Sequence, residues 1–335
     1  MGVRVYSCRV MLPIVIGLNI VLSVVLNSCT KPAPVSTQRL DQALFACHSR
    51  TDVVAFLTAH TGVAQLYFNA NNPAADTTLV NDLTRRLQNP ELRVLYDQTQ
   101  AEFGDAQPLT SQLAEAFDNI KRDYPTFKPP RVATFVTGFL GPDLLVSDSL
   151  ILIGLDYFVG PAATYRPRGE EFPRYVLRRY AQPYLIPTIV RMLATRFNEQ
   201  NPADQTLLAD MVYTGKSMVF TRSILPQTPD SLIIGYSDRQ LTETFNAQEQ
   251  VWAHFVDNQL LYQTNAEIKK RYTGERPYTV EIGNRCPGRI GDWLGWQIVS
   301  RYFDQKKLSI PELMRQTDAR SLFQQSGFRA QKETL

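Results

Sequence analysis

The segment RVATFVTGFLGPDLLVSDSLILIGL, residues 131–155, contains three short runs rich in Val, Ile, Leu and Phe. The runs cover residues 131–137, 143–147 and 150–155, and the pairs Gly141-Pro142 and Asp148-Ser149 separate them. Short apolar runs bounded by Gly, Pro, Asp and Ser are typical of β-strands joined by tight turns. The segment therefore predicts a small antiparallel sheet.

Helical patterns precede this sheet in the sequence. Apolar residues spaced by three and four begin at Leu40, after Ser36 or Thr37 as a possible N-cap. Further helical patterns cover residues 76–87, 90–103 and 109–124. The part of the chain before residue 131 is therefore predicted to be almost wholly helical.

Helical patterns also fill most of the chain after the sheet, beginning at Phe172. Pro183 and Pro187 both fall near a predicted helix start, where a missing N–H costs least. No linker after Thr37 divides the chain. The sequence therefore predicts one mainly helical α+β domain over residues 38–330, with a helical part (38–130) and a part with the sheet and further helices (131–330).

The N-terminus has the layout of a secretory signal peptide, because Arg4 and Arg9 are followed by uncharged residues 10–26. The run ends in Leu26-Asn27-Ser28-Cys29, which resembles a lipobox, although Asn27 replaces the usual small residue. This predicts removal of residues 1–28, a lipid on Cys29, and a short tether over residues 29–37. The alternative is an uncleaved anchor, because the 17 uncharged residues fall just short of the roughly 20 that a spanning helix needs.

The residues after Cys29 bear on which membrane holds the lipid. Thr30 is not the acidic residue that some bacteria use for retention in the inner membrane, and Lys31 is not followed by the acids of surface-export signals. These features favour the periplasmic side of the outer membrane.

Charge and cysteine content narrow the class of protein. The 335 residues carry a formal charge of +3, which falls to +1 when Arg4 and Arg9 leave with the signal peptide (3 − 2 = 1). A nucleic-acid-binding domain has a strong basic excess, so no nucleic-acid partner is expected. Cys47 and Cys286 remain in a compartment where disulfides persist, but two distant cysteines are more often independent buried residues.

The usual catalytic and cofactor motifs are absent from the sequence. The chain has three His and no H-E-x-x-H or C-x-x-C, so the familiar zinc spacings are missing. It also has no G-x-S-x-G elbow and no glycine-rich phosphate loop. We therefore expect no catalytic residues, no metal and no cofactor.

Arginine and tyrosine are concentrated in residues 172–198, which contain no Asp, Glu or His. Both residue types favour recognition surfaces, because each makes a large contact that ends in a polar group. The alternative is a solvated basic helix face packed against aromatic neighbours. The arginines of this segment are Arg174, Arg178, Arg179, Arg191 and Arg196.

A second distinctive segment covers residues 288–299, GRIGDWLGWQIV. Its apolar residues lie on more than one stripe of a helix, which predicts a buried helix. Gly291 and Gly295 allow a neighbouring backbone to approach closely. Packing explains this segment better than cofactor binding does.

Several blocks together resemble the gliding-motility lipoprotein GldB family. They span residues 131–328, about 60% of the chain. In order they are ATFVTG (133–138), IGLDYFVG (153–160), residues 179–194, Leu225-Pro226 with residues 234–236, EQVWAHF (249–255), PGRIG (287–291) and GWQIV (295–299). The resemblance implies a role in gliding and type IX secretion without enzymatic activity. It also implies that the partners are envelope proteins of that machinery and that the lipid on Cys29 binds the membrane.

The family is also distantly similar to zinc peptidases of the zincin type, which implies a degenerate peptidase fold. The helix expected to carry H-E-x-x-H corresponds to residues 183–197, where Leu185, Ile186, Thr188 and Ile189 stand instead. By analogy with such peptidases, the former substrate cleft would be kept as a binding site. The alternative is an envelope hydrolase with an unconventional site built from Glu249, Tyr157 and the arginines. The candidate partner-binding residues are Tyr157, Tyr175, Arg178, Arg179, Tyr184, Glu249 and Arg289.

Overall fold

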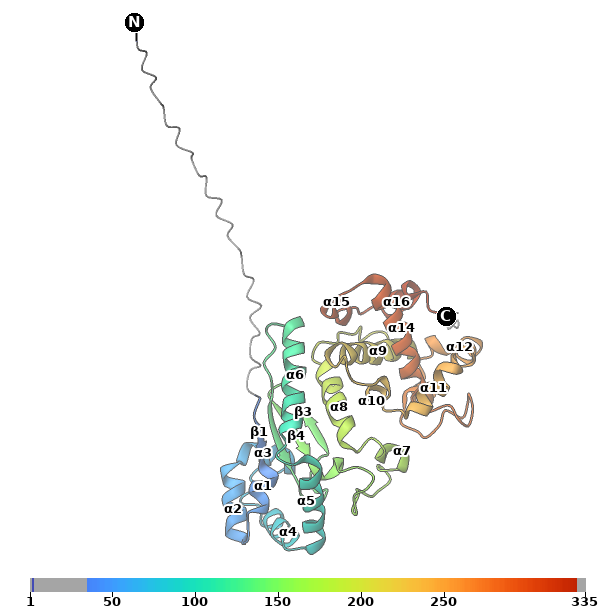
Figure 1. The fold of residues 1–335 in the computed structure, drawn as a ribbon. Helices are drawn as coiled ribbons and strands as arrows, with labels where there is room; N and C mark the ends of the chain where they lie inside the picture. The colour runs from blue at the N-terminus through green and yellow to red at the C-terminus, as the bar shows by residue number, and fades with distance from the viewer. Residues whose placement is uncertain (1, 3–34, 330–335) are drawn as a thin grey trace. The chain divides into compact units, whose positions relative to one another are not determined.

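The computed structural model describes Gly2 and residues 35–329, and the chain from residue 35 onward belongs to one compact unit (Figure 1). The expected signal peptide (1–28), the lipid site Cys29 and most of the tether lie outside the described residues. The described part is mainly helical with one small sheet, as the sequence predicts.

Four strands form a mixed sheet in the order β1-β2-β4-β3. β1, β2 and β4 are parallel, and β3 pairs antiparallel with β4. The three strands predicted between residues 131 and 155 are confirmed, but the prediction of an antiparallel sheet is wrong except for the β3–β4 pair. The strands are β1 Thr37–Arg39, β2 Arg131–Phe135, β3 Leu144–Val146 and β4 Leu150–Gly154.

Strand β1 replaces the predicted helix cap. Residues 37–39 pair with β2, and α1 (Leu40–Phe45) begins directly after them without a side-chain cap. Placing the N-cap at Ser36 or Thr37 was therefore wrong. Three residues are too few to show the alternation that identifies a strand, and the pairing partner lies more than 90 residues further along the chain.

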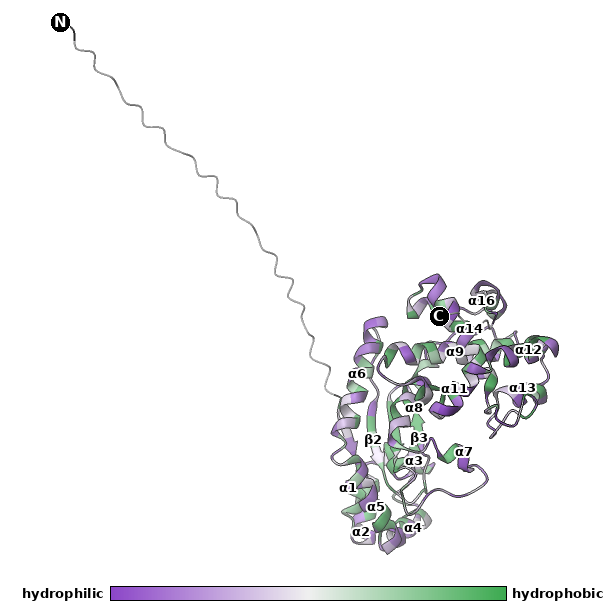
Figure 2. Ribbon diagram, turned by 45° about the vertical axis from the view of Figure 1, so that its right-hand side comes forward, coloured by the Kyte–Doolittle hydropathy of each residue, from purple (hydrophilic) through white to green (hydrophobic). Residues whose placement is uncertain are grey.

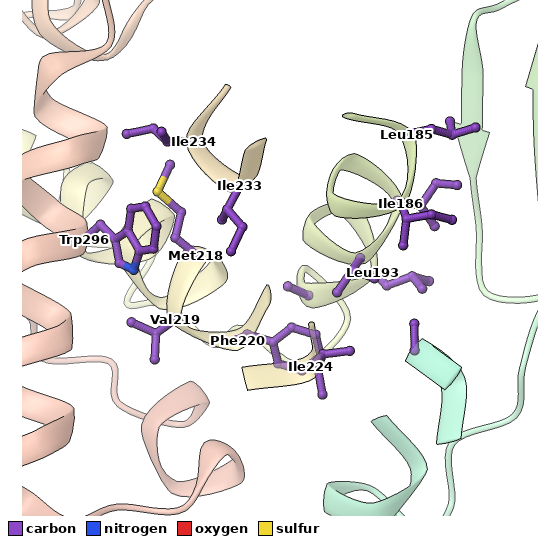
Figure 3. Packing of buried hydrophobic residues seen from close by; sticks show 14 of the residues in the cluster. Leu185, Ile186, Leu193, Met218, Val219, Phe220, Ile224, Ile233, Ile234 and Trp296 are labelled. Atoms are coloured by element: carbon purple, nitrogen blue, oxygen red, sulfur yellow. The ribbon is translucent and has the colours of Figure 1, made fainter. Parts of the chain in front are cut away.

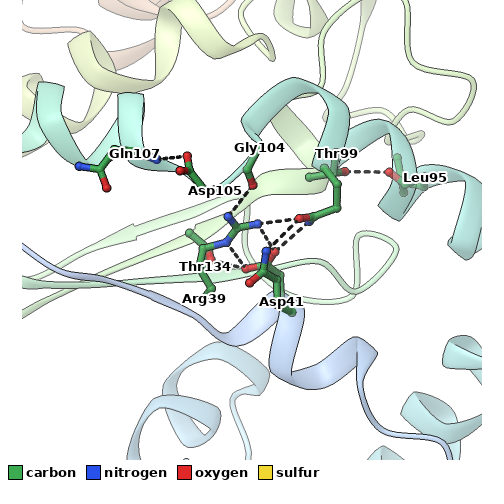
Figure 4. A network of polar contacts seen from close by, with 10 residues as sticks. Arg39, Asp41, Leu95, Thr99, Gly104, Asp105, Gln107 and Thr134 are labelled. Carbon is green, nitrogen blue, oxygen red and sulfur yellow. Dashed lines mark hydrogen bonds and ion pairs between the residues drawn. The ribbon is translucent and has the colours of Figure 1, made fainter.

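A buried polar network holds β1 in place (Figure 4). Arg39 forms a two-pronged ion pair with Asp41, with Nε–Oδ1 at 2.9 Å and Nη2–Oδ2 at 2.7 Å. Its Nη1 also donates to the Gly104 carbonyl at 2.8 Å. Thr134 of β2 donates to the Asp41 carboxylate, and Gln100 bonds to both partners of the ion pair. The network joins β1, α1 and β2 to the end of α5.

Helices cover both faces of the sheet. Ile151 and Ile153 of β4 face the larger hydrophobic core, which also contains α6 (Gln107–Asp123) and α8 (Gln182–Ala194). Leu150 and Leu152 face a smaller core formed with the helices between residues 40 and 87. Burial on both faces explains the continuous apolar run of β4. The remaining helices before β2 are α2 Arg50–Ala59, α3 Thr61–Phe68, α4 Thr77–Leu87, α5 Pro90–Phe103 and α6 Gln107–Asp123.

The chain after the sheet is helical, as predicted, and packs beside the sheet through α8 (Figure 1). Two 3-10 turns occur at Leu155–Phe158 (η1) and Leu260–Tyr262 (η2). The helices are α7 Arg174–Leu177, α8 Gln182–Ala194, α9 Leu207–Ile224, α10 Asp230–Ile234, α11 Asp238–Asn246, α12 Gln248–Asp257, α13 Ala266–Thr273, α14 Ile290–Lys306, α15 Ile310–Met314 and α16 Ala319–Ser326.

Helices α9 and α14 form the centre of this half and approach each other at two glycines. A Cβ atom on Gly295 would lie 2.0 Å from the Met211 carbonyl oxygen, and one on Gly215 would lie 2.5 Å from the Gly295 carbonyl oxygen. Figure 3 shows Trp296 of α14 beside Met218 of α9. The predicted burial of the helix that begins near residue 290 is therefore confirmed.

The helices carry both hydrophilic and hydrophobic residues, as expected for helices with one buried face (Figure 2). Among the described residues, none of the helices combines the length and hydropathy needed to cross a bilayer.

Candidate functional site

A cleft of about 300 Å3 lies between the edge strand β3, the end of α7, one face of α8 and α10. A larger hollow of about 480 Å3 lies beside Val251 and Cys286, but Arg179, Tyr184 and Arg191 line the smaller one. We call it the arginine–tyrosine cleft. It is lined by Asp143, Leu144, Phe158, Val176, Arg179, Tyr180, Tyr184, Thr188, Arg191, Met192, Leu232, Ile233 and Gly235.

Helix α8 forms one wall of the cleft. Tyr184, Thr188 and Arg191 are spaced by four and three residues, so they lie on one face of the helix. The opposite face packs into the larger core, as the apolar spacing predicts. It carries the fully buried Leu185, Ile189 and Leu193.

The two prolines of α8 occupy different positions. Pro183 lies in the first turn as predicted, but Pro187 lies inside the helix, so its placement near the helix start was wrong. Its missing N–H leaves the Pro183 carbonyl without the usual donor from four residues later. Burial of Pro187 and its neighbours in the core stabilises the helix despite this loss.

Arg191 is the charged group without a partner in the cleft. Its guanidinium makes no hydrogen bond or ion pair with any residue in the described part of the chain, although it is only partly exposed. Burial, with a further contribution from the charge of Arg289, lowers the pKa of Arg191 to about 10. A cation that is desolvated and unpaired favours the approach of an anion.

Two other arginines are held by an acidic residue behind the cleft. Glu275 accepts from Arg179 at 2.8 Å and lies 3.2 Å from Nε of Arg289. Burial disfavours its ionisation, but the charges of Arg289 and Arg179 outweigh burial and lower the pKa of Glu275. Burial raises the pKa of Asp292 to about 7, although Arg289 and Arg191 oppose it. Arg289 is only 7% exposed and also donates to the Ile234 carbonyl.

Arg178 and Tyr180 also make hydrogen bonds near the cleft, although Nε of Arg178 is buried without a hydrogen-bond partner in the described part of the chain. Arg178 donates to the Gly235 carbonyl at 2.8 Å and to Gln240 at 2.6 Å, so it fastens α7 to the end of α10. Tyr180 donates to Asp143 at 2.6 Å. Burial, followed by this hydrogen bond, raises the pKa of Tyr180 well above its ordinary value.

The structure brings together only some of the candidate residues from the sequence. Arg179 and Tyr184 line the cleft, and Arg178 and Arg289 lie directly behind it. Tyr157 is only 6% exposed and donates to the Gly141 carbonyl, so it packs beneath Tyr180. The residues that do not line the cleft are Tyr157, Tyr175 on α7 and the exposed Glu249 on α12. Glu249, Tyr157 and the arginines therefore do not share one site.

Sequence reasoning missed several residues of the site. Arg191 was singled out among the arginines of residues 172–198, but it was not placed with Tyr184 in one site. Thr188 could have been found, because it follows Tyr184 by four residues and shares its helix face. Asp143 and Glu275 could not, because Asp143 meets Tyr180, and Glu275 meets Arg179, only through contacts distant in sequence. Asp292 lies three residues after Arg289, so its contact with this arginine was within reach of the sequence.

Among the described residues, no group of three or more His, Cys, Asp or Glu side chains is placed to hold a metal ion. The cysteines Cys47 and Cys286 are both free, as the sequence favoured. Burial raises the pKa of Cys286 to about 12.

The chain matches the family model described as gliding motility protein GldB over residues 27–330. No match was found among curated proteins, and none among solved structures. The zincin-like architecture therefore stays a prediction. The match covers most of the chain, including the helical part before residue 131, which lies outside the blocks that carried the resemblance. The chain belongs to the GldB family of gliding-motility lipoproteins.

Proposed function

We propose that this lipoprotein is a non-catalytic binding component of the gliding and type IX secretion machinery, and that the arginine–tyrosine cleft binds a carboxylate of a partner protein. The observation that carries the proposal is the unpaired guanidinium of Arg191 inside a walled cleft. An arginine held in this way gains charge-assisted hydrogen bonds when a carboxylate enters.

The charge balance around the cleft favours an anion. Arg178, Arg179, Arg191 and Arg289 contribute four positive charges, and Asp143, Glu275 and Asp292 contribute three negative charges when all are ionised (4 − 3 = 1). Because burial raises the pKa of Asp292 to about 7, part of this carboxyl is protonated near neutral pH. The excess is therefore between one and two positive charges.

The uncharged walls favour a protein ligand over an inorganic anion. Phe158, Tyr184, Met192 and Ile233 line the cleft around the arginine. Such walls contact the apolar parts of a side chain, while a single charged group fixes its orientation. An acidic residue with apolar neighbours supplies both kinds of contact.

Replacing Arg191 with Met is expected to weaken partner binding by roughly 10- to 100-fold, because a hydrogen bond to a charged group contributes about 1.5–3 kcal/mol. The measurement is photo-crosslinking in living cells from a photoreactive residue at Met192, which lines the cleft and is 37% exposed. Crosslinks to envelope proteins should be lost. The melting temperature of the purified protein should stay the same or rise, since the unpaired cation is gone.

The matched control is Arg174→Met, which removes an exposed arginine of α7 outside the cleft and should keep the crosslinks. Equal crosslinking by the Arg191 variant would contradict the proposal. Stoichiometric zinc in the purified protein, with casein cleavage lost on chelation, would instead support the hydrolase alternative.

We also propose that the lipid holds the domain on the periplasmic side of the outer membrane, on the basis of Thr30 and Lys31. Cys29→Ala should abolish incorporation of radiolabelled palmitate and leave unprocessed precursor, because only this thiol at the predicted junction accepts diacylglycerol. Equal labelling of the variant would show that Cys29 is not the lipid site. Fractionation of the lipidated protein with inner membranes would contradict the outer-membrane placement.

A further inference from the structure

The edge strand β3 leaves backbone groups unpaired next to the cleft. The Gly154 amide donates to the Asp143 carbonyl, and the Ser147 amide donates to the Leu150 carbonyl, both at 2.9 Å. Hydrogen bonding alternates along an antiparallel pair, so Asp143, Leu145 and Ser147 direct their backbone groups toward β4. Leu144 and Val146 therefore direct theirs away from the sheet.

Leu144 and Val146 together direct two N–H and two C=O groups away from the sheet. Three of these four groups have no hydrogen-bond partner in the described residues. The Leu144 amide donates to the Asp143 side chain at 2.7 Å. The Leu144 carbonyl and the N–H and C=O of Val146 make no hydrogen bond with any described residue. Leu144 also lines the cleft. The free edge and the unpaired arginine thus belong to the same surface.

We propose that the ligand of the cleft is an extended peptide segment of a partner protein, which adds a strand to the free edge of β3 and places an Asp or Glu side chain against Arg191. This inference rests on the proposed function and names the form of its ligand. Only a peptide in extended conformation offers the alternating N–H and C=O groups that an open strand edge requires.

An acidic side chain fits this site better than a chain terminus does. Terminal carboxylates are commonly captured by successive backbone N–H groups. The candidate set here is the N–H groups of Thr137, Gly138 and Phe139, but Oδ2 of Asp156 accepts from all three at 2.9–3.0 Å. The site therefore offers a guanidinium and a strand edge, which suit a side-chain carboxylate within a longer segment.

The segment must also contribute apolar or aromatic side chains. Residues of an added strand alternate between two sides. When one side places the carboxylate at Arg191, its neighbours on that side lie against the Tyr184 and Met192 walls of the cleft. We therefore expect β-branched or aromatic residues on both sides of the acid.

The test uses two fluorescent heptapeptide pools, acetylated and amidated at the ends, with a central Glu or Gln and with Val, Ile, Thr or Tyr at the other positions. Binding to the purified mature protein is followed by fluorescence polarisation. We expect the Glu pool to bind at least about tenfold more tightly than the Gln pool, and Arg191→Met to abolish the difference.

Val146→Pro tests the strand addition itself. Proline removes the outward N–H of Val146 and keeps the β3–β4 bonds, since this N–H does not face β4. The Glu pool should bind at least about tenfold more weakly, because one backbone hydrogen bond and the fit of the added strand are lost. Val146→Ala shortens the same side chain but keeps the N–H, so it should weaken binding less than proline does. Melting curves of both variants check that the sheet is intact.

The outcomes separate the two proposals. Loss of binding in both Arg191→Met and Val146→Pro supports the added strand. Loss in Arg191→Met with full binding by Val146→Pro overturns the added strand and leaves the carboxylate site. Equal binding of the Glu and Gln pools, or binding by neither, counts against the carboxylate site and therefore against both proposals.

Discussion

Gly295→Leu is expected to lower the free energy of unfolding by at least about 3 kcal/mol, at the upper end of the usual cost of overpacking. Any Cβ at this position would lie 2.0 Å from the Met211 carbonyl oxygen of α9. The obstructing atoms belong to the backbone of a buried helix, so they cannot move aside as a flexible side chain would. α9 and α14 would have to separate, and the surrounding core would lose contacts.

The matched control is Gly62→Leu in α3. A Cβ on Gly62 would meet nothing within 4 Å, and the residue is exposed. Leucine also has a higher helix propensity than glycine, by up to about 1 kcal/mol, so this variant should be as stable as the wild type or slightly more stable. Urea unfolding of both variants gives the comparison. Equal unfolding midpoints would show that α9 and α14 are not in close contact at Gly295.

Asp41→Ala is expected to destabilise the protein by about 3–5 kcal/mol, which is the usual cost of leaving one partner of a buried ion pair uncompensated. Asp41 is fully buried, and the side chain of Arg39 is only 11% exposed. Removing the carboxylate also leaves the Thr134 hydroxyl and the Gln100 amide without their acceptor. Urea unfolding provides the measurement.

Two further variants make this test specific. Asp82→Ala removes the ion pairs of Asp82 with Arg85 and Arg86, whose side chains are 79% and 34% exposed, and should cost about 1 kcal/mol or less because exposed ion pairs contribute little. The double replacement of Arg39 by Met and Asp41 by Leu should recover much of the loss, because no unpaired charge remains. An Asp41→Ala variant as stable as Asp82→Ala would mean that the network does not hold β1.

The elements predicted well are those whose signals are local. The helix predicted over residues 76–87 is α4 with Asp76 as its N-cap, and the one over 90–103 is α5 with Pro90 in its first turn. Both begin at a capping residue and continue with apolar spacing, so neighbouring residues determine them. The apolar runs of β2 and β4 were also recognisable, because they are short, rich in β-branched and aromatic residues, and bounded by turn residues.

The features that were missed depend on residues distant in the sequence. The parallel pairing of β1 with β2 joins Thr37 to Val132, and no local pattern of three residues predicts such a partner. The candidate site has the same limitation. The sequence showed arginines without nearby acids, but Glu275, almost 100 residues from Arg179, forms an ion pair with it. Of the two arginines that line the cleft, Arg191 is the one without a partner among the described residues, and that distinction required the folded structure.

Strand β1 determines how tension from the membrane enters the protein. Seven residues lie between Cys29, the proposed lipid site, and Thr37 (37 − 29 − 1 = 7), so a pull on that lipid would reach the fold first at this strand. The bonds of a parallel ladder are evenly spaced, and a pull along β1 shears them all at once instead of unzipping them singly. The ion pair of Arg39 with Asp41 and the bond to Gly104 resist the same displacement. The proposed lipid anchor would therefore be attached to a point of the fold that resists shear.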